Sequence, residues 1–231
     1  HYDLYHSEFG QKFKSSWGPL AYLHPEDDRT LRTDNYYVEY DNKLNITRFN
    51  KIDTSVLDVP PVWEFIGLED GRLVRWGGKL YLCGVRRDTK PNGEGRMELS
   101  ELLVGPDYVK EVNRYRIQPP NNAPTYCEKN WMPILEMPWH FVKWTNPTEV
   151  VKVDISTLSS QTVFMGNQTI SLPRDLRGGS NLIELEDCRI AITHEVDLWW
   201  NENNCKDSQY YHRFVVWDKN WNIAKVTPTF K

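Results

Sequence analysis

Short apolar segments joined by tight turns recur along this chain of 231 residues, and helix-period patterns of comparable length are missing. Turn residues such as Gly77-Gly78 supply the positive φ that a two-residue hairpin needs. Only two short stretches, 99–104 and 148–154, have apolar residues at helical spacing. The chain is therefore predicted to be all-β, with strand–turn–strand units at 35–49, 72–85, 131–144, 182–194 and 211–226.

The spacing of these units favours one architecture. Polar or charged residues precede three of the hairpins, at 67–70, 127–130 and 177–180. Units that recur after about 50 to 60 residues and contain several short strands are typical of β-propeller blades. A sandwich would show shorter and more even spacing. We expect a single propeller-like domain over 1–231 with an irregular segment at 1–33. Because five blades need about 250 to 300 residues, the N-terminal blade is expected to be incomplete or the ring compact.

Composition narrows the class of partner. The chain has ten Trp and twelve Tyr, whose flat faces and polar edges suit sugar rings but also fill β-sheet positions. The net charge is −4 without a basic stripe, which argues against nucleic acid. No apolar run approaches the ~20 residues of a membrane span. The four cysteines form no C-x-x-C pair, so neither a zinc site nor a disulfide scaffold is expected. Nothing indicates the compartment.

The sharpest constellation is Glu69-Asp70-Gly71-Arg72, directly before an apolar strand. Inner strands of propeller blades begin near the central pocket, so these side chains can converge there. Repulsion between neighbouring carboxylates favours protonation of one of them, as a general acid requires. Arg72 can bind an anionic group or hold a carboxylate ionised. The alternative is a solvated turn.

A second cluster, Glu128-Lys129-Asn130-Trp131, precedes the third hairpin. Here Glu128 would be an acid, base or hydroxyl acceptor, Lys129 and Asn130 would be ligands, and Trp131 a stacking platform. Glycoside cleavage uses two carboxylates about 5 to 10 Å apart, and adjacent blades could present Asp70 and Glu128 to one pocket. The alternative is a structural ion pair of little energetic weight.

The last two hairpins supply further candidate ligands. The Gly178-Gly179 pair can let backbone N–H groups approach an oxygen closely. His194 and His212 lack the spacing of a helical metal pair, so these side chains are expected to bond to sugar hydroxyls or phosphate and not to a metal. No cofactor motif is present. The candidate ligands are Arg177, His194, Glu195, Tyr211 and His212.

Three stretches resemble the five-bladed β-propeller glycosidase superfamily. Residues 65–73 are similar to the Glu-Asp-Pro-Arg motif of glycoside hydrolase family 130, the mannoside phosphorylases and hydrolases. Residues 128–133 resemble that family's Lys-Asn segment, and residues 177–214 resemble its closing blades. A fainter likeness extends to families 43 and 32. The resemblance spans roughly residues 35–217, and Gly71 stands where the family has Pro.

The resemblance implies cleavage of a glycosidic bond in an oligosaccharide or glycan by inverting hydrolysis or phosphorolysis. Asp70 would be the general acid, with Glu69 and Arg72 orienting it; families 43 and 32 instead favour Glu128. No cofactor is implied. In phosphorolysis inorganic phosphate would be the co-substrate, held by Lys129, Arg177, His194 and His212. The alternative function is a non-catalytic glycan-binding or accessory domain of a glycan-assembly (glycosyltransferase) protein.

Overall fold

The computed structural model describes residues 14–15, 18–19, 31–167, 170–200, 202 and 206–231. Its regular structure consists of β-strands and one 3₁₀ turn, η1 (Pro120–Asn122), which confirms the all-β prediction. No helix in these ranges is long and apolar enough to cross a membrane. The irregular segment expected at 1–33 lies mostly outside the described residues, as does Cys205.

The two short stretches with apolar residues at helical spacing are strands. Residues 99–104 lie in β9 (Arg96–Val104), and residues 149–154 form β13 (Glu149–Asp154). Most of β9 is buried on both faces. Such a strand has apolar residues without strict alternation, and over a short window this cannot be told from a buried helix.

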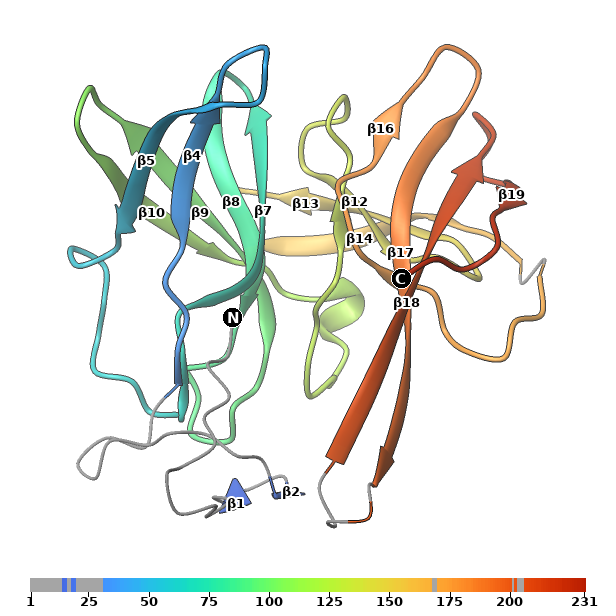
Figure 1. Ribbon diagram of the computed structural model, residues 1–231, viewed down its shortest axis with the longest axis horizontal. Helices are drawn as coiled ribbons and strands as arrows, with labels where there is room; N and C mark the ends of the chain where they lie inside the picture. Colours follow the sequence, from blue (N-terminus) through green and yellow to red (C-terminus); the bar gives the residue numbers. More distant parts are fainter. Residues whose placement is uncertain (1–13, 16–17, 20–30, 168–169, 201, 203–205) are drawn as a thin grey trace.

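The first sheet has six strands in the order β4-β5-β10-β9-β8-β7 and is strongly curled (Figure 1). Strands β7 to β10 form an antiparallel meander, and β5 joins β10 in parallel. The hairpins expected at 35–49 and 72–85 are confirmed as β4–β5 and β7–β8. The remaining strands of this sheet are β4 (Tyr36–Tyr40), β5 (Ile46–Asp53), β7 (Leu68–Trp76), β8 (Lys79–Arg86) and β10 (Val109–Arg116).

The second and third sheets follow in chain order, and each contains predicted hairpins. The second has the order β11-β12-β13-β14; the third has the order β15-β17-β18-β19, with β16 also on β17. Their other strands are β11 (Met132–Pro133), β12 (His140–Trp144), β14 (Ser159–Met165), β15 (Arg177–Gly178), β16 (Ile183–Glu184), β17 (Arg189–Trp200), β18 (Lys206–Trp217) and β19 (Ile223–Val226). Two small sheets pair β1 (Lys14–Ser15) with β2 (Gly18–Pro19) and β3 (Leu31–Arg32) with β6 (Phe65–Ile66).

Two apolar clusters hold the three large sheets together. Between the first and second sheets pack Val74, Trp76, Tyr81, Cys83, Met97, Leu99, Ile117, Trp131, Phe141, Val151 and Val153. Between the second and third pack Met132, Ile134, Val142, Val150, Leu176, Leu182, Ala191, Val215 and Trp217. Alternate residues of β13 enter opposite clusters, so the second sheet is buried on both faces. The sheets therefore stack in chain order, and the described strands form no closed ring of five blades.

The second and third sheets approach closely at Gly178 on β15. A Cβ atom at this position would lie 2.1 Å from the carbonyl oxygen of Asn130 and 2.5 Å from Cγ of Met132. The first of these neighbours is backbone, which cannot swing aside. Glycine is therefore required here by the packing of the two sheets.

We expect Gly178→Ala to lower the free energy of unfolding by about 1–3 kcal/mol, because the added methyl group must push the two backbones apart. The urea midpoint of unfolding measures this. Gly166→Ala is the matched control, since its Cβ would first meet the ring of Phe164 at 3.2 Å. Equal midpoints for the two variants would contradict the packing argument.

Candidate functional site

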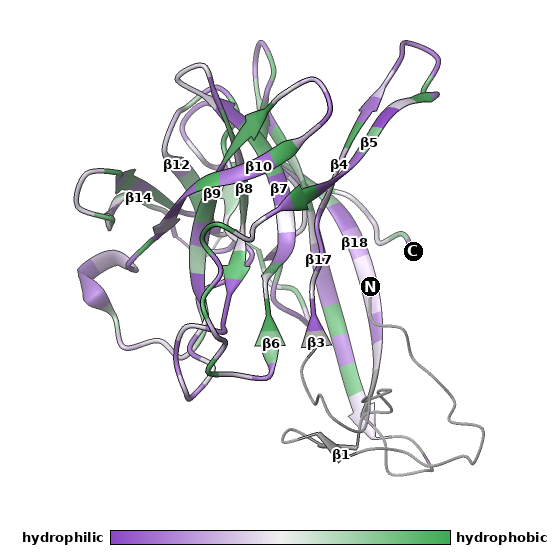
Figure 2. Cartoon of the chain, turned by 90° about the vertical axis from the view of Figure 1, so that its left-hand side faces the viewer, coloured by the Kyte–Doolittle hydropathy of each residue, from purple (hydrophilic) through white to green (hydrophobic). Residues whose placement is uncertain are grey.

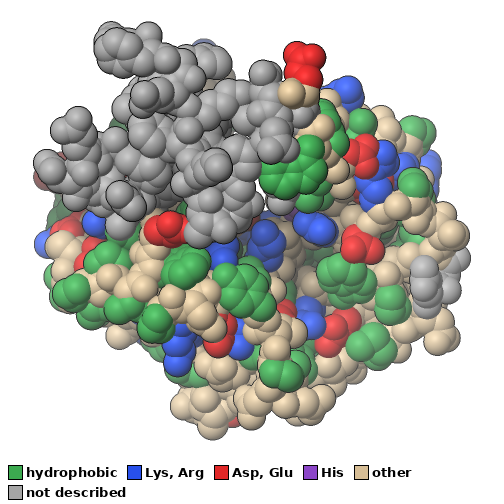
Figure 3. Space-filling view, turned by 90° about the horizontal axis from the view of Figure 1, so that it is seen from below, with side chains coloured by type: hydrophobic (Ala, Val, Ile, Leu, Met, Phe, Trp, Pro, Cys, Tyr) green, Lys and Arg blue, Asp and Glu red, His purple; other side chains and the backbone are tan. Residues whose placement is uncertain are grey.

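One open pocket of about 630 Å³ brings together residues from the first sheet, the third sheet and the segment directly before β11. We call it the central pocket. Seen from below, Lys and Arg side chains gather around a hollow near the middle of this face (Figure 3). Its lining residues are Asp70, Gly71, Arg72, Lys129, Asn130, Arg177, Gly179, Ser180, Ile192, His194, Tyr210 and His212.

A β-bulge in β7 presents Asp70 to the pocket. Between Glu69 and Arg72 the register with β8 shifts, so that Asp70 and Gly71 oppose the single residue Gly84. Asp70 has a φ of 55°, and a Cβ at Gly84 would lie 2.4 Å from the carbonyl oxygen of Glu69. A bulge re-aims side chains, and backbone held at positive φ is frequent at functional sites. Asp70 is consequently exposed in the pocket, whereas Glu69 does not line it.

The guanidinium group of Arg72 ties the pocket walls together. Its Nη2 donates to the carbonyl of Gly178 at 2.9 Å and its Nη1 to the carbonyl of Trp131 at 3.3 Å. A longer contact of 3.5 Å joins Nε to the carbonyl of Gly179. Burial lowers the pKa of Arg72, while the nearby Asp70 opposes that shift. Three of the five N–H groups of Arg72 are therefore engaged, and its charge remains at the pocket wall.

The third sheet contributes a row of three side chains across adjacent strands. In the β-sheet register Arg177 pairs with His194, and His194 pairs with His212. Along β17 buried and partly exposed residues alternate, which Figure 2 shows as alternating hydropathy. The row lies on the less buried face, together with Tyr210, whose ring centroid is 5.8 Å from that of His194.

The pocket is rich in positive charge. Arg72, Lys129 and Arg177 face a single carboxylate, that of Asp70, among the described lining residues. Burial, followed by repulsion from Arg177 and Arg72, lowers the pKa of His194 to about 4. His194 is thus a neutral hydrogen-bonding group at pH 7. Among the described residues no carboxylate forms a salt bridge with Lys129 or Arg177, so both can bind an oxyanion.

The structure brings together in the central pocket seven of the candidate site residues that the sequence analysis named. The predicted role of Trp131 is corrected. Its side chain is 1% exposed and packs edge-on against Phe141 in the core, so it cannot serve as a stacking platform. The seven that line the pocket are Asp70, Arg72, Lys129, Asn130, Arg177, His194 and His212.

The two further carboxylates proposed as functional are engaged elsewhere. Glu128 is buried and accepts hydrogen bonds from Thr125 Oγ1 at 2.8 Å and Trp131 Nε1 at 3.0 Å, so it fixes the core tryptophan. Glu195 is fully buried and pairs with Arg174 and Arg213. Neither lines the central pocket. The expected catalytic role of Glu128 and ligand role of Glu195 are therefore replaced by structural ones.

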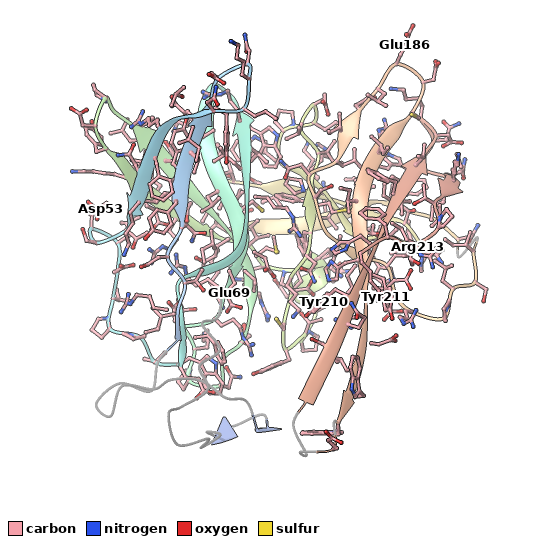
Figure 4. All side chains as sticks on the ribbon, viewed as in Figure 1. Asp53, Glu69, Glu186, Tyr210, Tyr211 and Arg213 are labelled. Atoms are coloured by element: carbon pink, nitrogen blue, oxygen red, sulfur yellow. The ribbon has the colours of Figure 1, made fainter. Side chains whose placement is uncertain are left out.

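The alternation of side chains along β18 also corrects the predicted ligand role of Tyr211. It faces away from the pocket, where Arg174 lies over its ring at 4.9 Å from the centroid. Tyr210, its neighbour, lines the pocket instead, and Figure 4 places the two on opposite sides of β18. Pairing His212 with Tyr210 by the two-residue period could have found it in the sequence.

The Gly178-Gly179 pair does not offer free N–H groups as expected. The N–H groups of Gly179 and Ser180 both donate to the carbonyl of Ile192 at 3.0 Å. Ser180, from the polar cluster at 177–180, lines the pocket, as does Ile192, which no sequence motif indicated. Within the described ranges no group of three or more His, Cys, Asp and Glu side chains could hold a metal ion. Comparison with protein-family models, curated proteins and solved structures gives no match.

The histidine in the middle of the row has a testable protonation behaviour. We expect the imidazole of His194 to titrate near pH 4 in NMR spectra, with His194→Gln identifying its signal. A histidine in the unfolded chain has a pKa of about 6.5. Between about pH 4 and pH 6.5 the unfolded chain therefore binds a proton at this residue that the folded chain does not. His194 thus contributes stability at neutral pH that is lost as the pH falls through this range.

A midpoint near pH 6.5 would contradict both the burial of the His194 ring and the cationic environment that we assign to the pocket. His140→Gln is the control for assignment, since His140 lies outside the pocket. Inorganic phosphate bound beside Arg177 would partly cancel the repulsion and raise the midpoint of His194.

Proposed function

We propose that the central pocket binds a glycan and cleaves a glycosidic bond by phosphorolysis, with Asp70 as general acid. The observation that carries this proposal is the meeting of one exposed carboxylate with several cationic side chains in one open pocket. In the same proposal the three stacked sheets correspond to three consecutive blades of a five-bladed propeller. Inner-strand residues of each blade would then surround the pocket, as β7, the segment before β11, and β15 do.

The proposed chemistry uses each wall of the pocket. Asp70 donates a proton to the glycosidic oxygen as the bond between that oxygen and the anomeric carbon breaks. Phosphate, held by Arg177, Lys129 and the histidines, attacks the anomeric carbon from the opposite face. The products are a sugar 1-phosphate and the shortened glycan, and Asp70 leaves the step as a carboxylate.

The number of carboxylates favours phosphate over water as the nucleophile. An inverting hydrolase needs a second carboxylate to activate water, about 6.5 to 9.5 Å from the acid. Among the described residues that line the pocket, Asp70 is the only carboxylate. Phosphate is already an anionic nucleophile and needs no such base, while cationic side chains suit its charge.

The second candidate is a non-catalytic glycan-binding domain that uses the same pocket. The small number of carboxylates in the pocket favours this candidate. Glu69 and Glu128 do not line the pocket, and a binding site needs no catalytic pair. Such a site would select glycans that carry carboxylate, sulfate or phosphate groups. The two candidates differ in whether bonds are broken when the pocket is occupied.

We expect release of sugar 1-phosphate from aryl glycosides and oligosaccharides only when inorganic phosphate is present. Asp70→Asn should reduce turnover at least about 100-fold, because the amide cannot donate the proton, while the glycan still binds. Phosphate-independent release of reducing sugar would instead show hydrolysis. Binding without release by the wild-type protein would support the second candidate, and unchanged turnover in Asp70→Asn would remove the assigned acid.

The cationic row gives a separate prediction. Arg177→Gln should weaken phosphate binding about tenfold or more, since it removes a charged hydrogen-bond partner. The matched control is Arg75→Gln, an exposed arginine on β7 that does not line the pocket. Calorimetric titration with inorganic phosphate measures both variants. Equal affinities of the two variants for phosphate would show that phosphate does not bind beside Arg177.

A further inference from the structure

A second pocket of about 340 Å³ adjoins the central pocket. The two share three lining residues, Lys129, Asn130 and Arg177, and therefore meet along the segment before β11 and the start of β15. We call the second one the Trp144 pocket. Its other lining residues are Cys127, Glu128, Trp131, Lys143, Trp144 and Gly178.

Trp144 is the aromatic residue that this pocket exposes. It ends β12 and is 36% exposed, in contrast to the buried Trp131. Its Nε1 donates to the carbonyl of Asn146 at 3.0 Å. The polar edge of the indole is thereby occupied, and the ring is held in one orientation. An exposed indole fixed in this way is a preformed platform for a flat apolar face.

Hydrogen-bonding groups surround this platform. Lys143 points its ammonium group between two carboxylates, 3.3 Å from Glu149 Oε2 and 3.8 Å from Glu128 Oε2. This arrangement fixes its position and offsets its charge. Lys129 and Asn130 lie on the side shared with the central pocket. The pocket thus combines an apolar face with donors at its edge, which matches the C–H face and hydroxyl edge of a pyranose.

We propose that the Trp144 pocket binds a second sugar unit of the same glycan, stacked on the indole of Trp144, while the first unit occupies the central pocket. This inference rests on the proposed glycan-binding function. It names the ligand class as oligosaccharides of two or more units. The shared residues then lie beside the glycosidic linkage that joins the two units.

The test compares affinity for one unit with affinity for several. The probes are monosaccharides and the matching tetrasaccharides, titrated calorimetrically against the full chain. We expect Trp144→Ala to reduce the tetrasaccharide-to-monosaccharide affinity ratio about tenfold, equivalent to a contact of about 1.4 kcal/mol. Trp144→Phe should keep most of the ratio, because it retains a flat ring. Trp199→Ala, which changes an exposed tryptophan on β17 that lines neither pocket, should keep the wild-type ratio.

The outcomes separate this inference from the proposed function. Glycan binding or cleavage by the wild-type chain, with the same length dependence in Trp144→Ala, would overturn the second subsite and leave the central pocket standing. Absence of glycan binding by the wild-type chain would overturn both. An equal loss of ratio in Trp199→Ala would point to a general effect of removing tryptophan and would also overturn the assignment.

Discussion

The contacts of Arg72 hold the candidate site together. One side chain from β7 of the first sheet reaches carbonyl oxygens of Trp131 beside the second sheet and of Gly178 in the third. Apolar clusters bring the sheets into contact, but such contacts have no direction. The guanidinium bonds are directional, and they fix how the three inner edges lie relative to one another. Loss of Arg72 would leave these carbonyls without a charged donor and loosen the pocket they surround.

This arrangement explains why the pocket is cationic and yet stable. Arg72 satisfies backbone oxygens, and Lys129 and Arg177 have no carboxylate in salt-bridge contact among the described residues. Their repulsion is relieved by exposure and by the neutral state of His194, whose pKa is about 4. A bound oxyanion would relieve it further, which is the physical basis for expecting phosphate or an acidic glycan. Carboxylates placed deeper, such as Glu195, instead pair with arginines and stabilise the third sheet.

The central pocket and the Trp144 pocket together form a surface suited to an extended ligand. The central pocket has charge and the hydrogen-bonding row, whereas the Trp144 pocket has an indole face. Two of their shared residues, Lys129 and Asn130, lie directly before β11, and the third, Arg177, lies on β15. Gly178 allows these two segments to approach closely. The close packing of the second and third sheets is therefore also what makes the two pockets contiguous.

The sequence by itself determined the all-β class, the five hairpins and most of the residues that line the central pocket, because turn chemistry and strand patterns are local. It did not determine which face each side chain takes. The bulge that separates Glu69 from Asp70, and the alternation that buries Glu195 and turns Tyr211 away in favour of Tyr210, follow from strand register. Burial decided the remaining cases: Trp131 and Glu128 have the residue types of a sugar site, but the packing of sheet on sheet encloses them. Register and burial depend on contacts between residues far apart in the chain, which local patterns do not encode.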